Sequence, residues 1–358
     1  MFERANRLFE ERCLGNGNTI VTHFGFPIES FGNDGLEFAS CPHASGGHPT
    51  RNGLRSKCVT TGITPCLIFT AKVFMIMKVS PSPHHGAAMR EYLDLVDRVL
   101  SKGSLKKNRT GVDTISCFAE HYTIDLSEGY PLLTTKRMQT KSLFYEVLWY
   151  LSGEDHIRNL RNQTKIWDAW ADEYGNLETA YGRYWRRFPS AEVNPKTGKY
   201  EVKEIDQIAL VLHLLKTNPT SRRMVISAWE PGNASHSKLP PCHYTFVFNV
   251  QGNKLNCHLT QRSGDIALGI PFNIAAYSLL TQAIAQDVGL EVGYFSHTIV
   301  DAHIYVNHID GLKEQLKRTP KPRPKLIIAK KPLDELRYED FSLVGYECDE
   351  PIKFEVAV

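Results

Sequence analysis

The residues best suited to chemistry lie in the segment 239–273. Cys242 stands at the start of a stretch in which apolar and polar residues alternate, and a second alternating stretch follows the turn-forming residues 251–254. A period of two predicts a pair of strands, and the turn composition between them predicts a hairpin. Folding the chain about this turn brings Cys242 opposite residues 261–263, to within one residue of register.

This pairing places a cysteine beside an arginine. Cysteine is a nucleophile as the thiolate, and the guanidinium of Arg262 favours that charged form of Cys242. Arg262 can also bind a phosphate through two parallel hydrogen bonds, with the Ser263 hydroxyl as a further donor. The segment therefore predicts a nucleophile next to an anion site, suited to a nucleotide or sugar phosphate. The alternative is that Cys242 is an ordinary buried cysteine of a strand.

A second candidate is Glu146, which lies inside residues 140–151, the most apolar predicted helix of the chain. A carboxyl group in apolar surroundings resists ionisation, which suits a group that transfers protons near neutral pH. The alternatives are that Glu146 reaches solvent from the helix edge or pairs with a buried arginine.

A third cluster follows the predicted strand 293–299 and contains Asp301, His303, Tyr305 and His308. These residue types raise the possibility of a metal site. Alternation instead puts Asp301, His303 and Tyr305 on one face of an extended segment.

Several separate motifs occur in a consistent order along residues 89–358. They are NRTG at 108–111, PLLTTKR at 131–137, EVLW at 146–149, IWD at 166–168, SRR at 221–223, the hairpin, and DAHIY at 301–305. With these motifs the chain resembles the thymidylate synthase family over residues 89–358. The resemblance implies a single α+β domain on a large mixed β-sheet flanked by helices, which dimerises through the sheet.

The resemblance also implies a reaction. Deoxyuridylate (dUMP) is reductively methylated to thymidylate (dTMP), and 5,10-methylenetetrahydrofolate supplies both carbon and hydride and becomes dihydrofolate. Cys242 adds to C6 of the uracil, and no metal, flavin or nicotinamide cofactor is implied. The implied catalytic residues are Cys242, Glu146, Tyr181, Asn273 and Asp265.

Binding residues are implied in the same way. The nucleotide would contact Arg109, Gln261, Arg262, Ser263, Asn273, His303 and Tyr305, and Arg222 and Arg223 would reach the phosphate of the partner subunit in a homodimer. The folate would contact Ile166, Trp167, Asp265, Gly269, Phe272, Lys136 and the terminal residue Val358.

Asn273 bears on the choice of base. It precedes the apolar stretch 274–288, a predicted helix, and could simply be its N-cap. A carboxamide also has both a donor and an acceptor, which match the O4 and N3–H edge of uracil, whereas cytosine presents the opposite pattern. Superfamily members that act on cytosine nucleotides typically carry aspartate at the corresponding position, so Asn273 favours dUMP.

Two other functions remain open. A pyrimidine nucleotide hydroxymethylase would end the reaction with water, and Trp167 and Val358 favour hydride transfer because exclusion of water decides the outcome. An RNA-binding regulator is the alternative from another class. The net charge of +3, from 42 basic and 39 acidic residues, gives RNA binding no independent support.

Composition also indicates the compartment. Eight cysteines without close regular spacing favour a reducing environment over a disulfide framework. No apolar run approaches a membrane span, and residues 1–14 lack the pattern of a secretory signal. These features predict a cytoplasmic enzyme.

Residues 1–88 differ in composition from the rest of the chain. This difference predicts a poorly ordered N-terminal extension or a start-site artefact, with Met89 as the functional start. A zinc knuckle is an alternative for the extension, but the spacing of its ligand-type residues matches none of the usual zinc patterns. Those residues are Cys41, His43, His48 and Cys58. Farther along, residues 189–204 predict a surface loop or small insertion.

Overall fold

The computed structural model describes residues 88–108 and 111–356. The chain divides into the units Met1–Ile76 and Met77–Val358, and every described residue belongs to the second. The predicted extension up to residue 87, with its four candidate zinc ligands, lies outside the described residues. So do the predicted phosphate ligand Arg109 and the predicted folate contact Val358.

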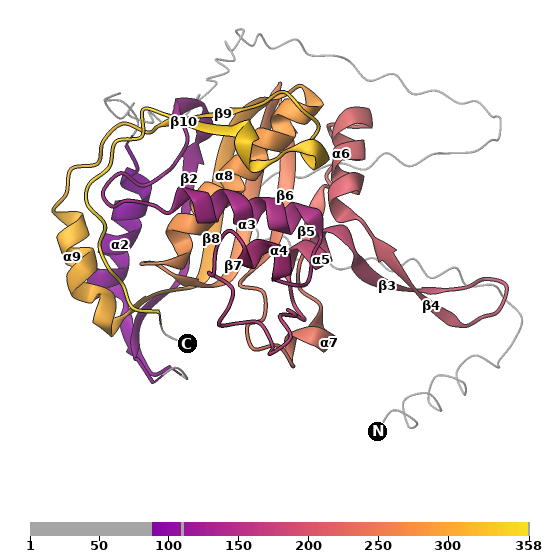
Figure 1. The fold of residues 1–358 in the computed structure, drawn as a ribbon, viewed down its shortest axis with the longest axis horizontal. Helices are drawn as coiled ribbons and strands as arrows, with labels where there is room; N and C mark the ends of the chain where they lie inside the picture. Colours follow the sequence, from indigo (N-terminus) through magenta and orange to yellow (C-terminus); the bar gives the residue numbers. More distant parts are fainter. Residues whose placement is uncertain (1–87, 109–110, 357–358) are drawn as a thin grey trace, which may run out of the picture. The chain divides into compact units, whose positions relative to one another are not determined.

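A six-stranded sheet forms the centre of the described fold (Figure 1). In spatial order its strands are β1 (Ser104–Lys106), β2 (Thr114–Asp125), β8 (Glu291–Tyr305), β7 (Lys254–Asp265), β6 (His243–Gln251) and β5 (Val225–Ser227). β7 and β8 are parallel, and the other neighbours are antiparallel. The predicted mixed sheet is confirmed.

The longest helix, α8 (Gly269–Val288), packs against β7 and β8, and α3 (Thr140–Ser152) packs on α8 (Figure 1). α8 is buried on nearly all sides because it lies between the sheet and α3, which explains its almost continuous apolar sequence. In the described residues the other α-helices are α2 (Arg90–Lys102), α4 (Arg158–Arg161), α5 (Tyr181–Arg186), α6 (Gln207–Thr217), α7 (Pro231–Ala234) and α9 (Ile309–Leu316).

Two small hairpins lie outside the six-stranded sheet. β9 (Lys325–Ile328) pairs with β10 (Phe341–Val344). β3 (Phe188–Val193) pairs with β4 (Tyr200–Ile205) and extends away from the sheet (Figure 1). Of the two alternatives predicted for 189–204, the loop is wrong, because the two halves pair as antiparallel strands around a turn that contains Gly198. The small insertion stays a prediction.

The predicted β6–β7 hairpin is confirmed. Gln251 pairs with Lys254, and Gly252 in the intervening turn has φ +61°, a conformation that glycine adopts without strain. At the other end the Arg262 N–H donates to the Cys242 carbonyl oxygen at 2.8 Å. The hairpin thus sets the cysteine directly beside the arginine.

The structure corrects the predicted start of α8. The helix begins at Gly269, and the Asp265 carboxylate accepts the N–H groups of Ala267 at 2.9 Å and Leu268 at 3.3 Å just before it. Pro271 fits in the first turn because its missing N–H would have no partner there. Asn273 lies one turn inside the helix, so its interpretation as the N-cap is wrong.

β8 continues beyond the predicted end at residue 299 because β2 pairs with it as far as Thr114 and Tyr305. Asp301, His303 and Tyr305 therefore lie on the strand itself. The pairing gives this polar segment a rigid backbone at the edge of the site.

Candidate active site

A cavity of about 950 Å³ lies where the C-terminal ends of β7 and β8 meet the first turn of α8. Its walls bring together residues from as far apart in the chain as Lys106 and Val356. The predicted site residues among them are Glu146, Ile166, Trp167, Tyr181, Cys242, Gln261, Arg262, Ser263, Asp265, Gly269, Phe272, Asn273, His303 and Tyr305.

Cys242 lies against a fixed guanidinium. Arg262 Nη2 is 3.6 Å from Cys242 Sγ and donates to the Pro240 carbonyl oxygen at 2.7 Å. Arg262 Nε donates to the Pro241 carbonyl oxygen at 3.0 Å. Because these two backbone bonds hold the arginine, its positive charge stays beside the sulfur and favours the thiolate.

Tyr181 touches the backbone of the same cysteine. Its hydroxyl oxygen accepts the Cys242 N–H at 2.7 Å, and its ring stacks on His243 with centroids 3.6 Å apart. Burial raises the pKa of Tyr181 well above its ordinary value and lowers the pKa of His243 to about 3. Both groups are therefore neutral near pH 7.

Glu146 faces the cavity from α3. Trp167 Nε1 donates to Glu146 Oε1 at 2.8 Å, and the glutamate side chain is buried. Burial raises the pKa of Glu146 to about 7, although hydrogen bonds from Trp167 and Tyr150 oppose the shift. A carboxyl group with this pKa can both take up and release a proton near neutral pH.

The raised pKa of Glu146 predicts a pH-dependent cost to stability. The pKa of this carboxyl group moves from 4.5 to about 7 on folding, so the folded state binds the proton more tightly than the unfolded state. Proton binding therefore stabilises the fold in full below pH 4.5, and this stabilisation is lost as the pH rises through 7. The free energy of unfolding of Glu146→Gln, relative to that of wild type, is therefore expected to rise by about 2–3 kcal/mol between pH 5 and pH 8. Urea unfolding at both pH values measures this gain, and an equal difference at the two pH values would contradict the raised pKa.

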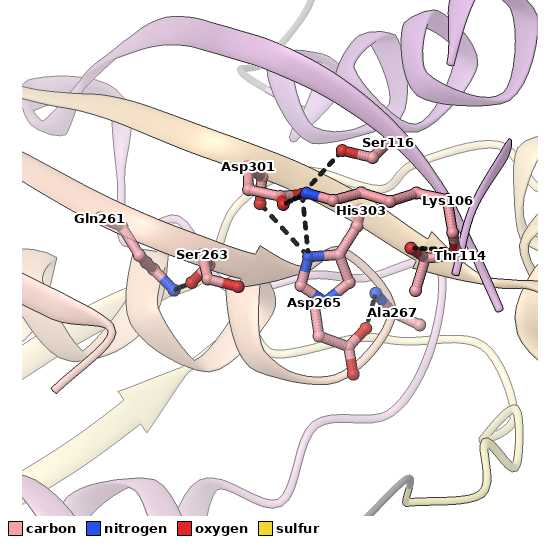
Figure 2. Close-up of polar contacts among 9 residues, drawn as sticks. All are labelled: Lys106, Thr114, Ser116, Gln261, Ser263, Asp265, Ala267, Asp301 and His303. Carbon is pink, nitrogen blue, oxygen red and sulfur yellow. Dashed lines mark hydrogen bonds and ion pairs between the residues drawn. The ribbon is translucent and has the colours of Figure 1, made fainter. Parts of the chain in front are cut away.

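A buried chain of polar groups positions Gln261. Gln261 Nε2 donates to the Ser263 carbonyl oxygen at 2.8 Å (Figure 2), while its Oε1 lies 3.1 Å from His297 Nε2. The other ring nitrogen of His297 lies 2.6 Å from the Tyr122 hydroxyl. Since burial holds the pKa of His297 well below its ordinary value, the ring is neutral. The sequence offered no signal for this chain, because its members come from three separate strands.

The polar end of the cavity contains His303 and Tyr305, whose rings meet edge to face at 5.3 Å. Figure 2 shows the neighbouring contacts of Asp301 with Lys106, Ser116 and His303. Within the described part of the chain no group of three or more histidine, cysteine or acidic side chains is arranged to hold a metal ion. Sequence reasoning missed Lys106, which also lines the cavity.

An apolar wall of Ile166, Trp167, Trp170 and Phe272 forms another part of the cavity lining. Aromatic and aliphatic side chains of this kind suit the flat ring system of a folate. Asp265 adds a carboxylate to the same lining.

Lys136 lies outside the cavity lining. Its Nζ donates to the Ala267 carbonyl oxygen and lies 4.7 Å from the ring centre of Phe354, while burial lowers its pKa to about 8. His308 Nε2 meets the Glu355 carbonyl oxygen at 2.7 Å on the same C-terminal segment. Both residues thus hold the segment that brings Val356 to the cavity wall.

Arg222 and Arg223 also lie outside the cavity lining. Both are exposed in the segment just before β5, the edge strand of the sheet. None of the helices in residues 88–108 and 111–356 combines the length and apolar composition that a membrane crossing requires.

Comparison with known proteins agrees with this geometry. The family described as thymidylate synthase matches residues 90–358, a range that includes every residue lining the cavity. A thymidylate synthase from Haloferax volcanii is 46% identical over 341 residues, in an alignment that covers 78% of this chain and 100% of that protein. The chain therefore belongs to the thymidylate synthase family.

Proposed function

We propose that this chain converts dUMP to dTMP by reductive methylation, with 5,10-methylenetetrahydrofolate as the donor of carbon and hydride. The observation that carries the proposal is Cys242 Sγ, 3.6 Å from the Arg262 guanidinium in a cavity that also holds Glu146 and Asn273. Cys242 supplies the nucleophile and Arg262 the anion contact. Glu146 supplies a proton-transfer group, and Asn273 supplies a carboxamide that can form hydrogen bonds to uracil.

Each group has a defined task in the proposed reaction. Addition of the Cys242 thiolate to C6 of uracil makes C5 nucleophilic toward the one-carbon unit. Tyr181 and Glu146, the latter through water, then assist the loss of the C5 proton. The apolar wall that includes Trp167 keeps bulk water from the exocyclic methylene, so that hydride from tetrahydrofolate completes the methyl group. The Cys242–C6 bond breaks in the same step, which releases dTMP, dihydrofolate and the free thiolate. Asp265 would accept N–H groups of the pterin ring.

The direct test is a covalent complex. Mixing the protein with 5-fluorodeoxyuridylate and 5,10-methylenetetrahydrofolate should give a ternary adduct at Cys242, because fluorine at C5 cannot leave as the proton does. Mass spectrometry of the intact protein and of its peptides would locate the adduct. Absence of the adduct under conditions in which both ligands bind would overturn the proposal.

Asn273→Asp is expected to change the preferred base. A carboxyl group can accept from the 4-amino group of cytosine and, when protonated, donate to N3, whereas uracil presents the opposite pattern. We expect kcat/KM for dUMP to fall by about 100-fold, the cost of one mismatched pair of hydrogen bonds, and deoxycytidylate to become a substrate. Product assays with both nucleotides check this change.

The matched control is Asn162→Asp, which makes the same chemical change at an exposed residue just after α4 and outside the cavity lining. This variant should keep the wild-type preference for dUMP. An Asn273→Asp enzyme with that same preference would mean that another group selects the base.

We further propose a homodimer formed through the sheet. The sheet face opposite α8 exposes His121, Thr123 and Tyr294, of which Tyr294 is 47% exposed. Arg222 and Arg223 stand at the edge of this sheet, exposed and outside the lining of their own cavity. A two-fold axis through the face would let them reach the partner's phosphate site, and a monomer would lack part of its anion clamp.

Mixed dimers test this arrangement. Cys242→Ser and Arg223→Ala are each expected to be weakly active alone. In a mixed dimer, the subunit with an intact Cys242 receives an intact Arg223 from its partner, so random mixing of equal amounts should restore about a quarter of wild-type activity. No recovery in mixtures that have exchanged subunits would mean that Arg223 acts within its own subunit or not at all.

The cytosol is the proposed compartment. The cysteines Cys117, Cys257 and Cys348 are not in disulfides in the described part of the chain. Unpaired thiols at several depths of a fold suit a reducing environment.

A further inference from the structure

Asp301 connects three neighbouring strands at the polar end of the cavity. Its carboxylate pairs with Lys106 Nζ from β1 and accepts a hydrogen bond from Ser116 Oγ of β2 at 2.7 Å (Figure 2). On its own strand, β8, Asp301 Oδ1 lies 3.6 Å from His303 Nδ1. The contact with His303 contributes most, and those with Lys106 and Ser116 add to it. Together they hold the pKa of Asp301 well below its ordinary value, so the carboxylate stays ionised.

The surroundings of His303 define which ring nitrogen carries the proton. Nδ1 faces two acceptors, the Asp301 carbonyl oxygen at 3.2 Å and the carboxylate at 3.6 Å. Because neither group can donate, Nδ1 must be protonated. In a neutral imidazole the other nitrogen, Nε2, then carries a lone pair. Lys106 and Ser116 hold the Asp301 carboxylate in place beside the ring.

We propose that Asp301 is a positioning residue that, with Lys106 and Ser116, keeps the proton of the neutral His303 ring on Nδ1. Nε2 then presents an acceptor to the 3′-hydroxyl of the nucleotide. This inference rests on the proposed function, in which His303 and Tyr305 bind that hydroxyl. An acceptor on Nε2 makes the site selective for a sugar whose 3′-hydroxyl donates a hydrogen bond, because a nucleotide without that hydroxyl leaves a buried acceptor unpaired.

The tautomer can be measured without any substrate. In protein labelled with ¹⁵N-histidine, long-range ¹H–¹⁵N spectra at pH 8 distinguish a protonated from an unprotonated ring nitrogen, and the His303→Gln variant assigns the signal. We expect a protonated Nδ1 and an unprotonated Nε2. A proton on Nε2 would overturn the proposal, and this result does not depend on whether the protein uses dUMP.

The functional consequence is measured with two nucleotides. Wild type is expected to bind dUMP about 10-fold more tightly than 2′,3′-dideoxyuridylate, the cost of one unpaired acceptor. In Asp301→Asn, whose carboxamide can donate to Nδ1 and release the tautomer, this ratio should fall to about 2-fold. KM for dUMP should rise while kcat changes little.

The matched control is Glu120→Gln, which removes one partner of the 2.7 Å ion pair between Arg98 of α2 and Glu120 of β2, outside the cavity lining. The ratio of its affinities for dUMP and 2′,3′-dideoxyuridylate should equal that of wild type. Equal weakening of both nucleotides by Asp301→Asn would assign Asp301 a purely structural role and overturn the proposal. Failure of wild type to bind either nucleotide would instead refute the proposed function, and the tautomer measurement would still decide the role of Asp301.

Discussion

Cys242→Ser is expected to lower kcat by at least about a thousandfold, the scale seen when an enzyme loses its nucleophile. A serine hydroxyl stays protonated beside Arg262, whereas the cysteine can form the thiolate that attacks C6. Binding of dUMP should change little, because the phosphate and base contacts remain. Turnover and equilibrium binding of dUMP measured on the same preparation separate the two effects.

Cys117→Ser is the matched control for this substitution. Cys117 is a half-buried cysteine of β2 that lies outside the cavity lining. It has no nucleophilic task, so the variant should keep wild-type turnover. A Cys242→Ser enzyme that works within about tenfold of wild type would show that the covalent route through this sulfur is wrong.

Glu146→Gln should lower kcat by about 100-fold to 1,000-fold, the usual contribution of a positioned proton-transfer group. Glutamine keeps an oxygen for the Trp167 N–H but cannot exchange a proton. Because the proposed removal of the C5 proton uses the ionised Glu146 carboxylate, kcat of wild type should rise with pH through about 7, the pKa of Glu146. The variant should lack this rise, and pH–rate profiles of the two proteins measure it.

The control is Glu154→Gln, just beyond the end of α3 and outside the cavity lining. The pH–rate profile of this variant should match that of wild type. If Glu146→Gln kept the rise near pH 7, another group would control the proton transfer, and the role given to Glu146 would have to be withdrawn.

The pairing of residues at the centre of the proposed chemistry could be predicted from local sequence. Alternation and a glycine-containing turn were enough to pair Cys242 with Arg262, because hairpin register depends on residues close in the chain. The apolar neighbours of Glu146 along α3 likewise indicated a carboxyl group that resists ionisation, and its pKa of about 7 agrees.

Errors arose where distant parts of the chain decide the local structure. The start of α8 depends on the Asp265 carboxylate at the end of β7, and the length of β8 depends on its pairing with β2. The place of Lys136 likewise depends on Ala267 and Phe354, residues far from it in sequence. Local propensity contains no information about such partners.

The sequence by itself determined which residue types are present for the reaction, the cysteine–arginine hairpin and the family to which the chain belongs. Only the tertiary structure decided which side chains share the cavity and how burial there shifts the pKa values of Glu146, Tyr181 and His243. The physical reason is that pKa values and tautomers follow from burial and from partners a few ångströms away. At Asp301 those partners come from three strands, and no local pattern along the chain specifies how the strands meet.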